Sequence, residues 1–290
     1  MCICRFVKCL IEIDFSISFF FAYILVRGAD KINFQVGDIV SRISHNHDVF
    51  FKISKIDNDV VLLQGLDVRL CADAFIDDIV LVSEQDSDDE EIIQRNIRDL
   101  KIDRNNYFYI PGKILHIDGD DDYLDRCMKF YNNLGIQANG ISLHESLISS
   151  KILELIKEYR PDIIVITGHD AYYSKKNDMN NINNYENSAN FVSAIKEVRK
   201  YEKNQDKLII IAGACQSSYE ELIKAGANFA SSPKRINIHA LDPAIIASSI
   251  AFSEKNKSID LIKLIEKTKY GSDGIGGIIT NGTMYVGYPR

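Results

Sequence analysis

The sequence lacks three patterns that would assign it to a class at once. Its formal net charge is −7, so it has no basic surplus of the kind that nucleic-acid-binding proteins carry. It has no uninterrupted apolar run of about 20 residues, the length needed to cross a bilayer. Its six cysteines have neither zinc-knuckle spacing nor the density of a disulfide framework. We expect a soluble protein of a reducing compartment that does not bind nucleic acid.

The first 31 residues contain the one segment that raises the question of a membrane. Residues 15–26 are strongly apolar, but Glu12 and Asp14 stand directly before them. A run of about a dozen residues is too short to span a bilayer, and the acidic residues do not suit a signal peptide. We interpret residues 1–31 as an apolar extension upstream of the folded chain, and expect no membrane partner.

Residues 32–83 have the pattern of a small β domain. Val36-Gly-Asp-Ile-Val40 opens it, and short apolar runs follow, separated by Gly, Asn and Asp; they lie at residues 49–53, 60–63, 68–70 and 78–82. Closely spaced short strands with such turns predict a small barrel of the SH3-like kind.

Residues 84–106 separate this domain from the rest. Six of the eight residues from Glu84 to Glu91 are acidic, which indicates a solvated, self-repelling linker. The spacing of Ile92, Ile93, Ile97 and Leu100 adds a short connecting helix.

Residues 107–290 alternate between strand and helix patterns. Apolar runs predict strands at 113–117, 138–143, 162–167, 208–212 and 228–232, with helices between them, for example at 145–159 and 187–201. Such alternation predicts an α/β domain with a mainly parallel sheet and helices on both faces. At the end of the chain, Asn281-Gly282 between apolar residues predicts a hairpin over 276–286.

Two of the predicted strands end in residues suited to nucleophilic catalysis. The run 208–212 leads to Cys215, and the run 162–167 leads to His169, 46 residues earlier. Ligands and chemistry gather at the carboxyl edge of a parallel sheet, and a thiol beside an imidazole is a catalytic pair. A helix predicted to begin near Gln216 would direct its positive end at the Cys215 sulfur and favour the thiolate.

The order of these residues along the chain separates classes of thiol enzyme. Amidotransferase-like hydrolases use Gly-x-Cys-x-Gly with a later histidine; here Gly213-Ala-Cys-Gln-Ser217 lacks the second glycine, although His239 lies downstream. Histidine before cysteine, about 50 residues apart, is the order of the caspases. Three alternatives stay open: a Cys215–His169 peptidase, an amidotransferase-like hydrolase using Cys215 with His239, and a non-catalytic assembly protein in which Cys215 is structural.

The longer motifs resemble a known family. The chain resembles the YabG family of sporulation-specific peptidases, within the caspase and gingipain clan. The motifs that carry the resemblance are Val36-Gly-Asp-Ile-Val40, Ala212-Gly-Ala-Cys-Gln-Ser217 and residues 111–120, 159–172, 225–233 and 235–243. The similarity covers about residues 33–289.

The resemblance implies a cysteine endopeptidase with a caspase-like domain at 107–290. Its implied partners are spore coat and germination-related protein substrates, and its implied location is the mother-cell cytoplasm and the forming coat. Cys215 would be the nucleophile, His169 its acid–base partner, and no metal or organic cofactor would be needed. The backbone amides of Cys215, Asp170 and Gly168 are expected to bind the oxyanion. Clan members usually have a glycine after the catalytic histidine, whereas Asp170 follows His169 here.

The specificity pocket follows from the same resemblance, since clan members place a pocket residue at the end of their first strand. Asp118 and Asp120 stand there and would pair with an arginine side chain before the cleaved bond. Both aspartates also suit a turn and helix cap. Ser231 and Asp242 are further candidates for the lining of the cleft.

Overall fold

The computed structural model describes residues 34–82, 88–100, 106–173 and 178–289. The extension expected at residues 1–31 lies outside these ranges. None of the helices in the described ranges is long and apolar enough to cross a membrane.

Five antiparallel strands form the first folded part. They are β1 (Ile39–Arg42), β2 (Phe50–Asp57), β3 (Val60–Gly65), β4 (Cys71–Phe75) and β5 (Ile79–Leu81), with short 3₁₀ turns η1 (Ile43–His45) and η2 (Ile76–Asp78). Their order is β4-β3-β2-β1-β5. Alternate residues such as Phe51, Ile53, Val61 and Leu63 are buried, as expected for a sheet with one covered face. The predicted short strands are present, but they pair as an open antiparallel sheet instead of a closed barrel.

The segment expected as an acidic linker contains a packed helix, α2 (Asp89–Asp99). Ile92 and Ile93 are buried in the main apolar core, and the Asp89 carboxylate accepts two hydrogen bonds of 2.7 Å from Arg126 on α3. This part of the segment is therefore attached to the α/β domain and is not solvated on all sides.

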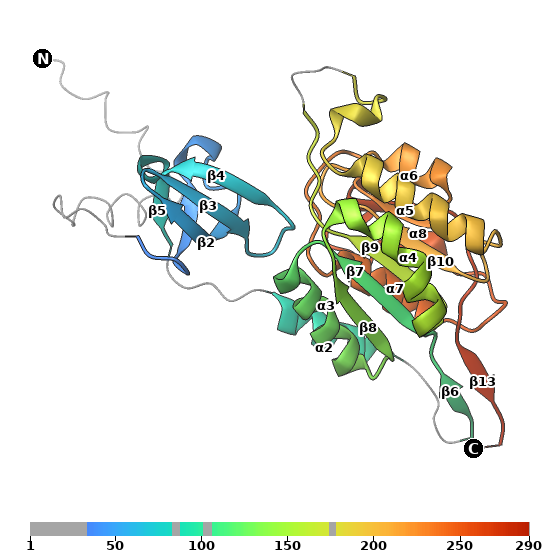
Figure 1. Ribbon diagram of the computed structural model, residues 1–290. Helices are drawn as coiled ribbons and strands as arrows, with labels where there is room; N and C mark the ends of the chain where they lie inside the picture. The colour runs from blue at the N-terminus through green and yellow to red at the C-terminus, as the bar shows by residue number, and fades with distance from the viewer. Residues whose placement is uncertain (1–33, 83–87, 101–105, 174–177, 290) are drawn as a thin grey trace, which may run out of the picture. The chain divides into compact units, whose positions relative to one another are not determined.

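The α/β domain is built on a six-stranded sheet in the order β12-β11-β10-β9-β7-β8 (Figure 1). Its strands are β7 (Ile114–Asp118), β8 (Ala138–Ser142), β9 (Ile163–Thr167), β10 (Ile209–Ala212), β11 (Phe229–Ser231) and β12 (Ile275–Gly277). All neighbours pair in parallel except β11 and β12, which pair antiparallel. The predicted α/β class, with a mainly parallel sheet, is confirmed.

Helices cover both faces of this sheet. They are α3 (Asp121–Leu134), α4 (Glu145–Tyr159), α5 (Ser188–Tyr201), α6 (Tyr219–Ala225), α7 (Asp242–Ala251), α8 (Leu261–Ile265) and α9 (Gly271–Gly274), with the 3₁₀ turn η4 (Ile182–Asn184). Successive strand residues point to opposite faces. Ile163 and Val165 accordingly join the core that contains α2, α3, α7 and α8, whereas Ile164 and Ile166 join the core that contains α4, α5 and α6.

The hairpin predicted at the end of the chain is wrong. β12 pairs with β11, and β13 (Tyr285–Gly287) pairs antiparallel with β6 (Phe108–Ile110), more than 170 residues earlier. The segment around Asn281 therefore connects strands of two different sheets.

Candidate active site

The carboxyl edge of the parallel sheet gathers the predicted site residues. Asp118 is the last residue of β7, His169 follows β9, and Cys215 follows β10. In the sheet, β9 lies between β7 and β10. Parallel neighbours end at the same edge, so the three loops that carry these residues leave the sheet side by side.

Asp118 is fully buried and holds a guanidinium. Its Oδ2 lies 2.5 Å from Arg69 Nη1 and accepts a hydrogen bond of 2.7 Å from Thr167 Oγ1. Burial by itself raises the pKa of Asp118, but the Arg69 cation, with hydrogen bonds from His116 and Thr167, holds this pKa well below its usual range. Asp118 is therefore a charged carboxylate facing an arginine, whereas the sequence predicted a substrate arginine there. The arginine is supplied by the chain itself.

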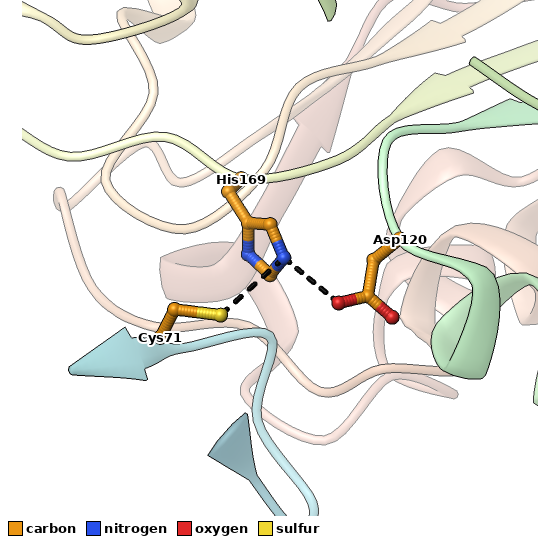
Figure 2. A group of neighbouring side chains, drawn as sticks. All are labelled: Cys71, Asp120 and His169. Carbon is orange, nitrogen blue, oxygen red and sulfur yellow. Dashed lines mark hydrogen bonds and ion pairs between the residues drawn. The ribbon is translucent and has the colours of Figure 1, made fainter. Parts of the chain in front are cut away.

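Asp120, His169 and Cys71 form a second cluster, from the start of α3, the loop after β9 and the first residue of β4 (Figure 2). His169 Nε2 donates to Asp120 Oδ2 at 2.9 Å, and the Cys71 sulfur lies 3.5 Å from the same nitrogen. Burial lowers the pKa of His169, but the bonds to Asp120 and Cys71 raise it to about 10. Both bonds favour the protonated form of the ring. Its buried Nδ1 has no hydrogen-bond partner among the residues that the structure describes.

The backbone of His169 is hydrogen-bonded to a carboxylate that the sequence patterns did not single out. Glu145 Oε1 accepts the His169 backbone N–H at 2.7 Å and is buried. A Cβ on Gly119 or on Gly168 would lie 2.2 Å from this oxygen. Gly168 is therefore required as glycine for the close approach of Glu145, a role separate from the oxyanion amide predicted for it.

Cys215 lies in a tight turn between two residues of positive φ, Gly213 at 103° and Gln216 at 56°. A non-glycine residue in this region costs backbone energy and is enriched at functional sites. The Cys215 sulfur is fully buried and accepts the Ile238 N–H at 3.3 Å. Burial raises the pKa of the thiol to about 12, although the bond from Ile238 and the nearby Arg69 oppose this.

The arrangement around Cys215 differs from the sequence prediction in two respects. The helix expected to begin near Gln216 is α6, which begins only at Tyr219, and the thiol pKa is raised instead of lowered. Within the described residues, no hydrogen bond joins the Cys215 sulfur to His169; the thiol contacts Ile238 and the imidazole contacts Asp120 and Cys71.

Asp170 connects the loops that carry the imidazole and the thiol. Its carboxylate accepts hydrogen bonds from the Ser217 hydroxyl and from the Asn187 backbone N–H, both at 2.8 Å. It also accepts a hydrogen bond from the Ser188 hydroxyl. Burial raises the pKa of Asp170 despite these bonds. The side chain fixes the two loops to the start of α5; its backbone amide stays a candidate for the oxyanion site.

The remaining candidates have partners that suit structural roles. Ser231 Oγ donates to Gly213 O at 3.2 Å, beside the Cys215 turn. Asp242 starts α7 and accepts the backbone N–H of His239 at 3.1 Å. Both ring nitrogens of His239 are engaged, Nε2 with Asp88 at 2.8 Å and Nδ1 with the Leu241 N–H at 3.1 Å. This leaves His239 no ring nitrogen for Cys215, so the amidotransferase-like alternative gains no support.

Two groups in the described ranges have donor atoms suited to a metal ion: Cys71 with Asp120 and His169, and Asp67 with Asp88 and His239. Thiolate, imidazole and carboxylate are zinc ligands. In the second group the Lys269 ammonium already contacts Asp88. In the first group, His169 Nε2 donates a proton to Asp120. This bond favours an acid–base role for His169 over metal binding.

Fold and site together define an α/β protein with a thiol, an imidazole and carboxylates at one edge of a mainly parallel sheet. Residues 35–289 match the family model described as YabG peptidase U57. The Sporulation-specific protease YabG of Bacillus subtilis (strain 168) is 39% identical over 286 aligned residues, which cover 89% of this chain and 99% of that protein. The chain belongs to the YabG peptidase family, as its motifs predicted.

Proposed function

We propose that the chain is a cysteine endopeptidase that cleaves proteins after arginine during sporulation, with Cys215 as nucleophile and His169 as acid–base partner. The observation that carries the proposal is the buried Asp118 carboxylate, which binds a guanidinium at the sheet edge that also bears the thiol and the imidazole. Arginine matches a carboxylate better than lysine does, because its planar fork donates from several N–H groups at once.

The chemistry follows from the groups present. In its neutral form the imidazole accepts the Cys215 proton as the sulfur attacks the carbonyl carbon of the arginine residue, and backbone amides stabilise the resulting oxyanion. The imidazolium then donates this proton to the leaving amine, which departs and leaves a thioester. Water, deprotonated by the imidazole, hydrolyses the thioester and regenerates the thiol.

The family supports the biological setting. The curated relative is a sporulation-specific protease by name. We extend this to substrates of the spore coat and the germination apparatus, and to activity in the mother cell and at the forming coat.

A competing nucleophile has one observation in its favour. Cys71 is exposed, and its sulfur is 3.5 Å from His169 Nε2. We prefer Cys215 because it follows the strand adjacent to the His169 strand and lies in the strained turn expected for a reactive group.

Three variants separate the assignments: Cys215→Ser, Cys71→Ser and His169→Ala, assayed with arginine-containing coat proteins and a short peptidyl-arginyl amide. Cys215→Ser and His169→Ala are expected to lose activity, and Cys71→Ser to retain it. Activity lost in Cys71→Ser and kept in Cys215→Ser would transfer the nucleophile to Cys71. Wild-type cleavage by both cysteine variants would exclude thiol catalysis.

A further inference from the structure

Arg69 is held as a bound ligand would be. The side chain is 1% exposed, and each guanidinium nitrogen has a partner: Nη1 with Asp118 at 2.5 Å, Nε with Ala240 O at 3.1 Å and Nη2 with Cys127 Sγ at 3.4 Å. The guanidinium also lies over the Tyr123 ring, 5.1 Å from its centre. All these partners belong to the α/β domain, whereas Arg69 belongs to the connection between β3 and β4.

The backbone around Arg69 pairs as a peptide strand added to the site. Val68 forms an antiparallel bridge with His239. Arg69 N donates to Ile238 O at 3.2 Å, and Ala240 N donates to Asp67 O at 2.9 Å. Extended pairing of this kind, with one side chain in a pocket, is a common way of holding a peptide.

This segment also lies close to both candidate catalytic groups, to Cys215 through Ile238 and to His169 through Cys71. Ile238, which accepts the Arg69 N–H, donates its own N–H to the Cys215 sulfur, so the thiol lies against the backbone that holds Arg69. Two residues further along, Cys71 occupies the Nε2 side of His169. The peptide bond after Arg69 thus lies on the stretch of chain between the contacts to Cys215 and His169.

The local conformation opposes cleavage of that bond. Leu70 N donates to Val68 O at 2.8 Å, and Leu70 O accepts from Gly65 N at 2.7 Å. The chain turns at Arg69 itself, and the Leu70 amide nitrogen donates within that turn. A substrate amide must instead receive a proton on this nitrogen from the imidazolium.

We propose that the segment Val68–Arg69–Leu70 is a built-in inhibitor that occupies the substrate groove, with Arg69 in the arginine pocket formed by Asp118, Ala240 and Cys127. The inference rests on the proposed function of the same site. Substrate enters only when the β3–β4 connection leaves the groove. The groove itself consists of residues 238–240, which pair with the substrate backbone, and of Asp118, which binds the arginine before the cleaved bond.

The first test is hydrolysis of a short fluorogenic peptidyl-arginyl amide. Arg69→Ala and Arg69→Lys are expected to raise kcat/KM by roughly tenfold or more, since an internal ligand reduces the fraction of competent sites. Arg42→Ala, which removes an arginine from β1 of the same small sheet, is the matched control and is expected to behave as wild type. Thermal unfolding of each variant checks the fold; if Arg69→Ala does not fold, Arg69→Lys, which keeps a cation opposite Asp118, decides.

The second test measures pocket occupancy without catalysis. In the Cys215→Ala background, a fluorescent peptide with the sequence of residues 64–72 is titrated against the protein with and without Arg69→Ala. We expect binding only when Arg69 is removed, and weaker binding of the same peptide with alanine in place of its arginine. Equal binding and equal hydrolysis with and without Arg69 would overturn the inhibitor and leave the peptidase intact. Binding gained on removal of Arg69 with hydrolysis by no variant would support the occupied groove and overturn the proposed function.

Discussion

Arg69 Nη1 lies 2.5 Å from Asp118 Oδ2, and neither side chain is accessible to solvent. Taking two charges out of water costs more than their attraction usually returns, so such a pair is a weak means of stabilising a fold. The pair joins the connection between β3 and β4 to the last residue of β7. An apolar contact would join them at lower cost. The proposed arginine pocket gives this carboxylate a role other than stabilising the fold.

The Arg69–Asp118 pair predicts strong energetic coupling. Asp118→Asn leaves a buried guanidinium without its counter-ion and is expected to lower the free energy of unfolding by about 3–5 kcal/mol. The double variant Arg69→Met/Asp118→Asn is expected to lose much less than the two single changes together. Urea denaturation of the four proteins gives the coupling, and Glu154→Gln, in an exposed pair with Lys151, is the control. Additive losses would contradict a direct pair.

The His169–Asp120 pair predicts a pH dependence. Burial lowers the pKa of His169, but its bonds to Asp120 and Cys71 raise it to about 10 from 6.5. Because the folded value lies above the unfolded one, the stability that the pair contributes is fully present below pH 6.5 and is lost as the pH rises from there through about 10. Proton NMR of the ring is expected to show a large fall of the His169 pKa in Asp120→Asn. An unchanged titration would mean that another group holds the proton.

The three described cysteines are expected to differ in reactivity. Alkylation needs a thiolate that the reagent can reach. Cys71 is exposed, whereas burial raises the pKa of both Cys127 and Cys215 to about 12. Iodoacetamide at pH 8 is therefore expected to modify Cys71 first, as read by peptide mass spectrometry. Removal of Arg69 is expected to make Cys215 reactive and to leave Cys127 slow; fast labelling of Cys215 in the wild type would contradict its burial.

The sequence predicted the features that depend on local patterns. Continuous apolar runs at 162–167 and 208–212 were sufficient for β9 and β10, because a strand covered on both faces needs no polar residues. The helix predicted at 145–159 is α4. Since parallel strands end together, His169, Cys215 and Asp118 were expected at one edge, and the structure has them there.

The remaining features depend on partners far away in the chain. The sequence pattern predicts a short strand over residues 68–70, which include Arg69. The partner of Arg69, Asp118, is 49 residues later in the chain. Cys71 and His169 are 98 residues apart. The Asn281-Gly282 turn signal was local, but β13 pairs with β6 near the start of the domain. No periodicity or spacing encodes such pairings, which depend on the packing of the whole chain.

Glu145 is expected to act as a positioning residue for His169. Its carboxylate accepts the His169 backbone N–H at 2.7 Å and fills the space left by Gly119 and Gly168. Glu145→Ala removes this support and is expected to lower kcat on an arginyl amide roughly ten- to hundredfold, because small displacements of an acid–base group are costly. KM is expected to change little, since the Asp118 pocket is untouched.

Two control variants test this role of Glu145. Glu145→Gln keeps an oxygen that accepts the N–H and is expected to restore most of the rate. Glu154→Ala, on the exposed face of the same helix α4, is expected to leave the rate unchanged. A rise in KM at constant kcat would assign Glu145 to substrate binding instead.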